Sequence, residues 1–296
     1  MTEAYAPLYE AKMLSYFDSR FQTYEGAESQ SLPGLTDAQH DDPNKEPLPR
    51  YWIGEEHVDE ALDGKWDREW LLGWRDIARS TDYRTFVTAG TPKVGTGNKF
   101  PVMLLGDARE ALTLTGVMSS FAFDFVARQK VAGTSVTFYL VEQFACPTPA
   151  QLGVAAPWQP SASISDEIRD RVRELTVTSW RMAPFARDMG DFGPPFRWLP
   201  ARREQIRTEL DAMMFHVYDL DRDEVDYVLD TFTVMRKYDE RDHGEYRTKR
   251  LILEYYDLLA SSISSGVGYV TPISPVPGDG PRHDESTRPE WMPGVE

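Results

Sequence analysis

Residues 85–105 read TFVTAGTPKVGTGNKFPVMLL, and they indicate the fold class of the chain. The run at 85–90 is rich in β-branched residues and predicts a strand, and the apolar run at 100–105 predicts a second one. The glycines between them predict a loop at 91–98. The pattern that follows, at 107–130, is helical over much of its length. Because strands and helices are mixed along the chain, we predict an α+β protein.

Two regions of different character lie on either side of a proline-containing stretch. Residues 1–150 mix short strand and helix patterns, which predicts a mixed α/β domain. Residues 151–163 are predicted to be a Pro-rich linker. Residues 164–263 are predicted to form a helical domain, and the amphipathic spacing is clearest at 201–220. Residues 264–296 are rich in Gly and Pro and are expected to be a disordered tail.

Two stretches are less easily assigned from their patterns. DREWLLGWRDIARS at 67–80 fits either a helix or a strand followed by a turn. If this stretch is helical, Arg75 and Arg79 share one face, because they are four residues apart. VAGTSVTFYLVEQF at 131–144 contains a Gly-Thr turn followed by β-branched and aromatic residues, which predicts a turn and then a strand.

The charge of the chain is strongly negative but uneven. Its 296 residues include 48 Asp and Glu and 32 Lys and Arg, for a formal net charge of −16, which at face value argues against DNA as a partner. Residues 1–67 carry −10 and residues 166–296 carry −8, whereas residues 68–134 carry +3. This basic island is typical either of a solvated surface with mild charge segregation or of a surface that faces a polyanion.

Composition excludes several classes of protein. Hydrophobic residues make up 41% of the chain, which is enough for a core and excludes full disorder. No stretch approaches the ~20 apolar residues of a membrane helix, and the mixed, acidic N-terminus does not resemble a signal peptide. Cys146 is the single cysteine, so a disulfide framework and a cysteine-built zinc site are excluded. We therefore expect a cytoplasmic protein that does not act at a membrane.

The glycine loop GTPKVGTGNK at 90–99 does not fit a nucleotide-binding motif. Thr96-Gly97 follows Gly95 where a P-loop needs Lys-Ser/Thr, and Phe100 occupies the place of the third glycine of a dinucleotide motif. The loop could still bring backbone N–H groups and the side chains of Lys93, Asn98 and Lys99 to a phosphodiester. No catalytic set, metal-spaced histidine pair or methyl-donor loop is found, so we predict no catalytic and no metal-binding residue.

Several long phrases resemble one family. They are PLYEAKMLSYFDSRFQTYEG (7–26), SSFAFDFVARQKVAGTSVTFYLVEQFACPTP (119–149) and GEYRTKRLILE (244–254). They resemble the C-terminal region of large bacterial N6-adenine DNA methyltransferases, which occur in type IIG restriction–modification enzymes and in phage-defence systems of the DISARM and BREX kind. The resemblance covers roughly residues 5–258, and a related arrangement is seen in type I specificity subunits.

The resemblance implies a function for residues 1–150 and a set of partners. In this family the region recognises the DNA target, while S-adenosylmethionine and the Asn-Pro-Pro-Tyr/Phe motif belong to a catalytic domain further upstream. We therefore expect a specificity module that binds double-stranded DNA, contains no cofactor of its own and works with a methyltransferase catalytic subunit or domain. The alternative is an assembly or regulatory subunit that does not itself bind DNA.

The basic island coincides with the stretch of strongest resemblance and supplies the candidate DNA-binding residues. Arg and Gln side chains can read guanine and adenine edges, whereas Lys usually contacts phosphate. The alternative interpretation is that Arg128 and Lys130 merely flank a turn. The candidates are Arg75, Arg79, Arg84, Lys93, Asn98, Lys99, Arg128, Gln129, Lys130 and Thr134.

Overall fold

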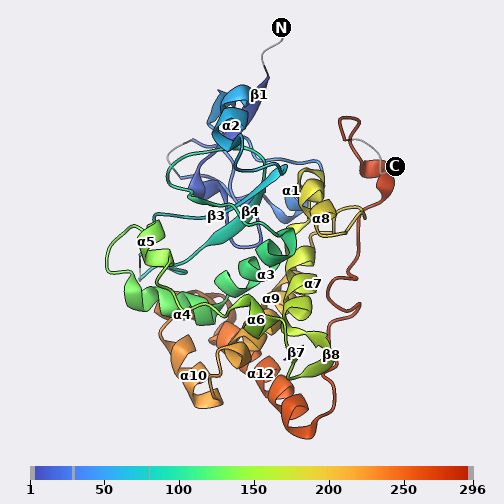
Figure 1. The fold of residues 1–296 in the computed structure, drawn as a ribbon. Coiled ribbons are helices and arrows are strands. Elements are labelled where there is room, and N and C mark those ends of the chain that lie inside the picture. Colours follow the sequence, from blue (N-terminus) through green and yellow to red (C-terminus); the bar gives the residue numbers. More distant parts are fainter. Residues whose placement is uncertain (1–3, 29–30, 80, 293–296) are drawn as a thin grey trace.

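The computed structural model describes residues 4–28, 31–79 and 81–292. Short strands and helices alternate in the first half of the chain, and helices dominate the second half (Figure 1). The protein is therefore α+β, as the mixture of patterns predicts. Most strands lie toward the end of the molecule that carries the N-terminus. The long helices α9 (Pro200–Val217) and α12 (Arg247–Ser265) lie toward the other end, with the short strands β7 (Ala155–Ala156) and β8 (Gln159–Ser163) beside α12 (Figure 1).

The strands form two three-stranded sheets and a separate hairpin. The first sheet has the order β2-β1-β5, in which β1 is antiparallel to β2 and parallel to β5. The second has the order β4-β3-β6, and all its pairs are antiparallel. The strands are β1 (Tyr5–Tyr9), β2 (Tyr51–Gly54), β3 (Trp70–Trp74), β4 (Thr88–Pro92), β5 (Gly95–Thr96), β6 (Val102–Met103), β7 (Ala155–Ala156) and β8 (Gln159–Ser163).

The stretch at 67–80 contains a strand, so the strand alternative is confirmed and the helix alternative is wrong. All five residues of β3 are buried. A strand that is covered on both faces is apolar throughout, and its sequence then carries no alternation to separate it from a helix. A Cβ on Gly73 would lie 2.3 Å from the carbonyl oxygen of Pro101, so the close approach of β6 requires glycine there.

The helices surround the sheets and form the second half of the molecule. Within the described ranges, no helix combines the length and apolar character that crossing a lipid bilayer requires. Besides α9 and α12, the helices are α1 (Asp37–His40), α2 (Glu55–Leu62), α3 (Ala108–Met118), α4 (Phe121–Lys130), α5 (Phe138–Val141), α6 (Pro149–Leu152), α7 (Ile164–Thr176), α8 (Ala183–Asp188), α10 (Arg222–Asp230) and α11 (Thr233–His243), with 3-10 turns η1 (Ala11–Met13), η2 (Trp180–Met182) and η3 (Glu285–Thr287).

The helical pattern at 107–130 is divided into α3 and α4 by two serines. The Ser120 hydroxyl accepts a hydrogen bond from the amide of Phe123 (3.2 Å) and so begins a new helix. Helix α3 then packs closely on α7, where a Cβ on Gly116 would lie 2.4 Å from Ile168. The stretch at 131–144 does not form the expected strand, because Phe138–Val141 is a helical turn that follows the cap residue Thr137.

One hydrophobic core runs through both regions that the sequence divides. Trp74 and Phe123 belong to the same cluster of buried side chains as Ile168, Leu210 and Leu259. The expected linker at 151–163 is structured too, because it contributes the end of α6 and the hairpin of β7 and β8. Helix α9 joins the two regions by packing on α4, α7 and α12.

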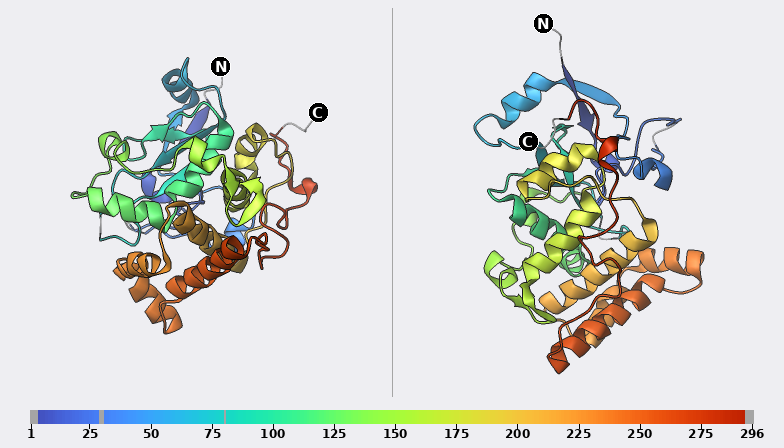
Figure 2. Two further views of the ribbon diagram at one scale, coloured as in Figure 1. Left: turned by 60° about the horizontal axis from the view of Figure 1, so that its bottom comes forward. Right: turned by 90° about the vertical axis from the view of Figure 1, so that its right-hand side faces the viewer.

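The segment after α12 is packed rather than disordered, which corrects the expectation for the described part of 264–296. It runs back along the molecule from the end of α12 toward α8 (Figure 1; Figure 2, right). Tyr269 and Ile273 are buried in the main core. The amide of Gly278 donates to the Glu174 carboxylate (2.8 Å), and the indole of Trp180 donates to the Thr287 hydroxyl (3.1 Å). Glycine and proline here produce an extended path that the core and these polar contacts hold in place.

Candidate functional site

The short segment after β3 connects several loops at the N-terminal end of the molecule. The amide of Arg75 donates to the carbonyl of Val87 (2.9 Å), and the amide of Asp76 donates to that of Lys99 (3.0 Å). Two residues further on, the amide of Ala78 donates to the carbonyl of Thr134 (3.3 Å). The segment therefore brings the glycine loop and the Gly133-Thr134 turn to the same part of the surface.

A groove of about 480 Å³ opens beside this segment. The ends of β1 and β2 form one side of it, and the residue pair Leu8–Tyr51 of their ladder contributes to the lining. The turn that contains Gly97 forms the other side, where the amide of Phe100 donates to the Gly97 carbonyl (3.0 Å). The groove is lined by Leu8, Tyr9, Glu10, Ala11, Lys12, Tyr51, Arg75, Ile77, Gly97, Asn98 and Lys99.

Arg75 is a half-buried cation in this groove without a carboxylate partner. Among the residues that the structure describes, no acidic oxygen lies within 4.0 Å of its guanidinium. The guanidinium donates to the carbonyl of Leu14 and lies 5.4 Å from the centre of the Phe21 ring, while its buried Nε has no hydrogen-bond partner. Burial lowers the pKa of Arg75 to about 10. An anion in the groove would therefore offset the cost of burying this positive charge without a carboxylate partner.

Lys99 and Lys12 add positive charge to the lining of the groove. The ammonium of Lys99 lies 2.8 Å from Asp76 and is half exposed, so its charge is shared between the carboxylate and the solvent. Burial pushes the pKa of Asp76 up, but hydrogen bonds from Lys99 and Ser135 outweigh this effect and hold that pKa below its usual value. Lys12 lies 3.3 Å from Glu10 and 5.1 Å from the centre of the Tyr24 ring. The groove as a whole carries a net positive charge.

The structure therefore brings together Arg75, Asn98 and Lys99 of the predicted site residues in one groove. Thr134 is exposed and is tied to the segment 75–78 by the Ala78 hydrogen bond. Arg79 is exposed next to that segment, and among the described residues it makes no ion pair.

Gln129 and Lys130 are the last residues of α4 and lead into the Gly133-Thr134 turn. Both side chains are exposed, but neither lines the groove.

Arg84 and Arg128 are held by contacts inside the protein, so their guanidiniums are not available on the surface. Arg84 is 6% exposed and pairs with Asp124 at 2.5 Å, and it also donates to the carbonyl of Ser119 (2.6 Å). Arg128 lies over the Phe232 ring at 3.9 Å and donates to the carbonyl of Asp82 (2.7 Å). Both guanidiniums hold loops and helices together around α4.

Lys93 is also occupied by carboxylates. Its ammonium lies 2.8 Å from Asp59 and 3.3 Å from Glu69. The hydrogen bond that Lys93 donates to Asp59 contributes most to raising the pKa of Lys93, and Glu69 adds to it. Sequence alone does not show this pairing, since Asp59 is on α2 and far away along the chain.

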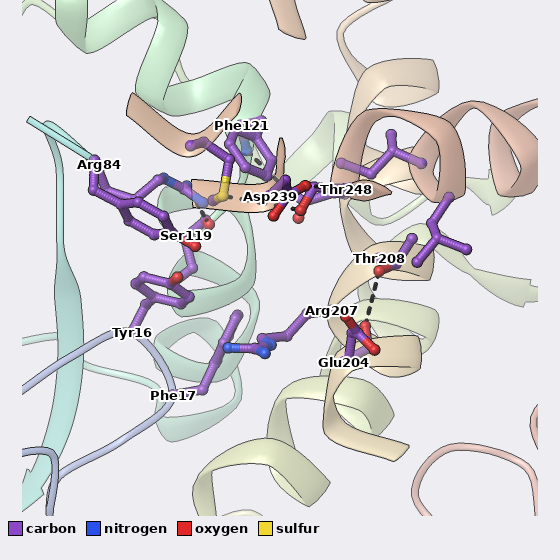
Figure 3. A pocket seen from close by; sticks show the side chains of 15 residues that line it. Tyr16, Phe17, Arg84, Ser119, Phe121, Glu204, Arg207, Thr208, Asp239 and Thr248 are labelled. Carbon is purple, nitrogen blue, oxygen red and sulfur yellow. Dashed lines mark hydrogen bonds between the residues drawn. The ribbon is translucent and has the colours of Figure 1, made fainter. Parts of the chain in front are cut away.

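A second cavity, of about 150 Å³, contains Arg84 and lies where α4, α9, α11 and α12 meet. Figure 3 shows Arg84, Ser119 and Tyr16 on one side of this cavity, with Asp239 and Arg207 across from them. Its lining mixes cations and carboxylates, so it does not select a ligand of one charge. Asp211, which also lines this cavity, accepts a hydrogen bond from the amide of Phe121 (2.8 Å), and burial raises the pKa of this carboxyl to about 6.

Eight of the eleven residues that line the groove were not among the sequence candidates, and Lys12, Tyr51 and Ile77 are the ones that bear on its chemistry. Lys12 is in the acidic N-terminal region, so a map of charge by segment hides it. Tyr51 and Ile77 are 50% and 59% exposed, which is unusual for large apolar side chains that share one hollow. The phrase PLYEAKM at 7–13, part of the family resemblance, was the one available signal for Lys12.

No family model, curated protein or solved structure matches the chain.

Proposed function

We propose that the chain is a DNA-binding specificity module of an adenine-specific DNA methyltransferase or restriction–modification system. In this proposal it binds double-stranded DNA in the bacterial cytoplasm and acts with a methyltransferase catalytic subunit or domain. Methyl transfer and the binding of S-adenosylmethionine belong to that catalytic part. The family resemblance of residues 5–258 suggests the system, and the groove at Arg75 suggests where DNA binds.

The observation that carries the proposal is the guanidinium of Arg75, which has no carboxylate partner among the described residues. Elsewhere in the described chain, most arginines and lysines of the surface are held by carboxylates, as Arg250 is by Glu245 and Glu254. A half-buried cation without such a partner is costly to keep. A DNA phosphate would supply the missing negative charge, and Lys99 and Lys12 could exchange their carboxylates for further phosphates.

The acidity of the rest of the molecule limits how tightly this groove can hold a duplex. The net charge of −16 repels a polyanion except where the field is locally positive. We therefore expect weak binding by the chain alone, with a dissociation constant near the nonspecific range of about 10⁻⁴–10⁻⁶ M. A more basic catalytic partner would strengthen the complex.

The test measures how binding of a labelled duplex pool of random sequence depends on salt. Arg75→Gln and Lys99→Gln should each weaken binding and should each reduce the slope of log K against log salt by roughly 0.9, the value for one phosphate contact. Lys237→Gln is the matched control, because Lys237 is an exposed lysine on α11, a helix that packs on α12 and does not line the groove. It removes the same charge and should leave the slope unchanged.

The outcome that would contradict the proposal is the absence of DNA binding at low salt, both alone and after mixing with the methyltransferase catalytic subunit. Co-elution with that subunit and no DNA binding would favour an assembly or regulatory subunit instead. Equal losses for Lys99→Gln and Lys237→Gln would show a general charge effect and would remove the groove as the DNA site.

A further inference from the structure

The groove that contains Arg75 has a property that contact with a phosphate backbone does not require. Much of its lining is apolar and comes from Leu8, Ala11, Tyr51 and Ile77. Its volume of about 480 Å³ lies within the range of about 300–1,000 Å³ that is typical of sites for small ligands. A phosphodiester needs only an exposed cationic surface. The hollow therefore fits a group that has apolar faces as well as charge, and this inference rests on the function proposed above.

Two different elements supply the large apolar side chains of the groove. Tyr51 is held on β2 by its pairing with Leu8 of β1, and the Arg50 guanidinium lies 5.2 Å from the centre of its ring. Ile77 lies in a bridge with Ser135. The side chains of Tyr51 and Ile77 are 50% and 59% exposed to solvent, although large apolar side chains are commonly buried in a core. A flat group between these side chains would remove that apolar surface from water.

A free amide borders the same hollow. The Asn98 side chain is exposed in the turn between β5 and β6, and within the described residues it makes no hydrogen bond. An asparagine amide offers one acceptor and two donor hydrogens, the pattern that pairs with the N6 and N7 edge of adenine. The groove thus offers three kinds of contact to a nucleotide. Apolar side chains can contact the face of a base, the Asn98 amide can bond its edge, and the Arg75 guanidinium can pair with a phosphate.

We propose that this groove holds one unstacked nucleotide of the DNA. The base lies against Tyr51 and Ile77, the Asn98 amide bonds its edge, and the 5′ phosphate pairs with Arg75. Stacking of a base on an aromatic side chain contributes about 1–3 kcal/mol, so the groove repays part of the cost of removing a base from its stack. A single strand or a mispaired site supplies such a base more readily than a perfect duplex does.

The experiment compares the binding of tetranucleotides with and without bases. The intact chain is titrated with labelled (dA)₄ and with an abasic tetramer of the same charge, and (dA)₄ should bind roughly 5–100-fold more tightly. Tyr51→Ala should abolish this difference and leave the affinity for the abasic tetramer unchanged. Tyr227→Ala is the matched control, because Tyr227 is a similarly exposed tyrosine on α10.

A second variant and two further ligands complete the test. Asn98→Ala changes an exposed side chain in a turn, and it should reduce the preference for (dA)₄ over (dT)₄. A duplex with a central mismatch should bind more tightly than its fully paired form. Free dAMP should bind at least tenfold more weakly than (dA)₄, because it lacks the flanking phosphates.

Three outcomes would overturn the inference. Equal affinities for the base-containing and abasic tetramers would show that the groove contacts the backbone alone. Equal affinities for dAMP and (dA)₄ would reassign it to a free nucleotide. Loss of the (dA)₄ preference in Tyr227→Ala would place the base elsewhere. In the first case the random-duplex experiment would still support DNA binding, whereas a chain that binds neither tetramer nor duplex would refute both proposals.

Discussion

Arg75 and Arg84 lie nine residues apart, and the fold places them in opposite electrostatic environments. Arg84 pairs with the fully buried Asp124, whose other oxygen lies 3.4 Å from Arg128. Arg75 has no such partner and lines the groove. Both residues are alike in the sequence, and only the position of the nearest carboxylate distinguishes a structural cation from one that is available to a ligand.

Substitution of Arg84 should therefore reduce stability rather than DNA contact. Arg84→Gln leaves Asp124 buried with incomplete compensation, and breaking a buried pair in this way costs about 3 kcal/mol of unfolding free energy. Urea denaturation measures the loss. Arg109→Gln, at an exposed arginine of α3, is the control and should leave the midpoint unchanged. A folded Arg84→Gln variant that loses DNA affinity without losing stability would contradict this assignment.

Asp211 makes the stability of the protein depend on pH. Its pKa is raised by burial from the usual 3.8 to about 6, so the folded state binds a proton more readily than the unfolded state. Stability is therefore greatest below pH 4 as far as this group is concerned, and it falls as the pH rises through 6. At pH 7 the ionised carboxylate costs the folded state up to about 3 kcal/mol.

Asp211→Asn removes this cost and keeps the oxygen that accepts from the Phe121 amide. The variant should be more stable than the wild type at pH 7.5, and the difference should shrink as the pH falls toward 5. Chemical denaturation at several pH values gives both curves. A variant that is less stable at pH 7.5 would show that the attraction of Arg84 for the carboxylate outweighs its burial.

At the scale of elements, the length of each segment decided how well its pattern predicted it. The helices α7 and α12 lie where amphipathic spacing predicts them, because each has enough turns for the period to show. Helix α9 also lies where it is predicted, although its polar residues Arg203, Glu209 and Asp211 are buried along with its apolar ones. The turn at α5 has only four residues, and its β-branched and aromatic composition points to a strand. The Phe138 ring lies 4.8 Å from that of Trp74, although none of the four residues of α5 is buried.

Removal of the final segment should destabilise the protein. A chain that ends at Gly266 loses the buried side chains of Tyr269 and Ile273, and the Glu174 carboxylate loses the amide of Gly278. We expect a loss of about 3–6 kcal/mol in unfolding free energy, from about 1.5–3 kcal/mol for each buried apolar side chain. Thermal unfolding compares this truncation with Val270→Ser, an 84% exposed position that should have little effect. An unchanged melting temperature after truncation would mean that the segment does not stabilise the fold.

At the scale of the molecule, the core joins the regions that the sequence divides. Phe121 at the start of α4 packs on Phe232 beyond α10, at a ring distance of 4.7 Å. Arg20 in the N-terminal region donates to the carbonyl of Thr178 (3.0 Å). Such contacts leave neither half with a complete core of its own.

The intact chain should therefore unfold in one cooperative transition. Tryptophan fluorescence reports on buried side chains of both regions, among them Trp70 and Trp74 in the second sheet and Trp158 and Trp180 beyond residue 150, and far-ultraviolet circular dichroism reports mainly on the helices. The two denaturation curves should coincide. Separate midpoints, with the helices unfolding apart from the sheet, would instead support two independent domains.

The sequence by itself determined the α+β class, the long amphipathic helices and the basic island at 68–134, because composition and periodicity are local properties of the chain. Tertiary structure alone decided which of the ten candidate residues share a groove. Whether a cation is free depends on carboxylates from distant segments of the chain. Asp59 pairs with Lys93 in this way, and Asp124 pairs with Arg84. Tertiary structure also decided the path of the chain after α12, since the contacts that hold this Gly- and Pro-rich segment come from α7 and the core.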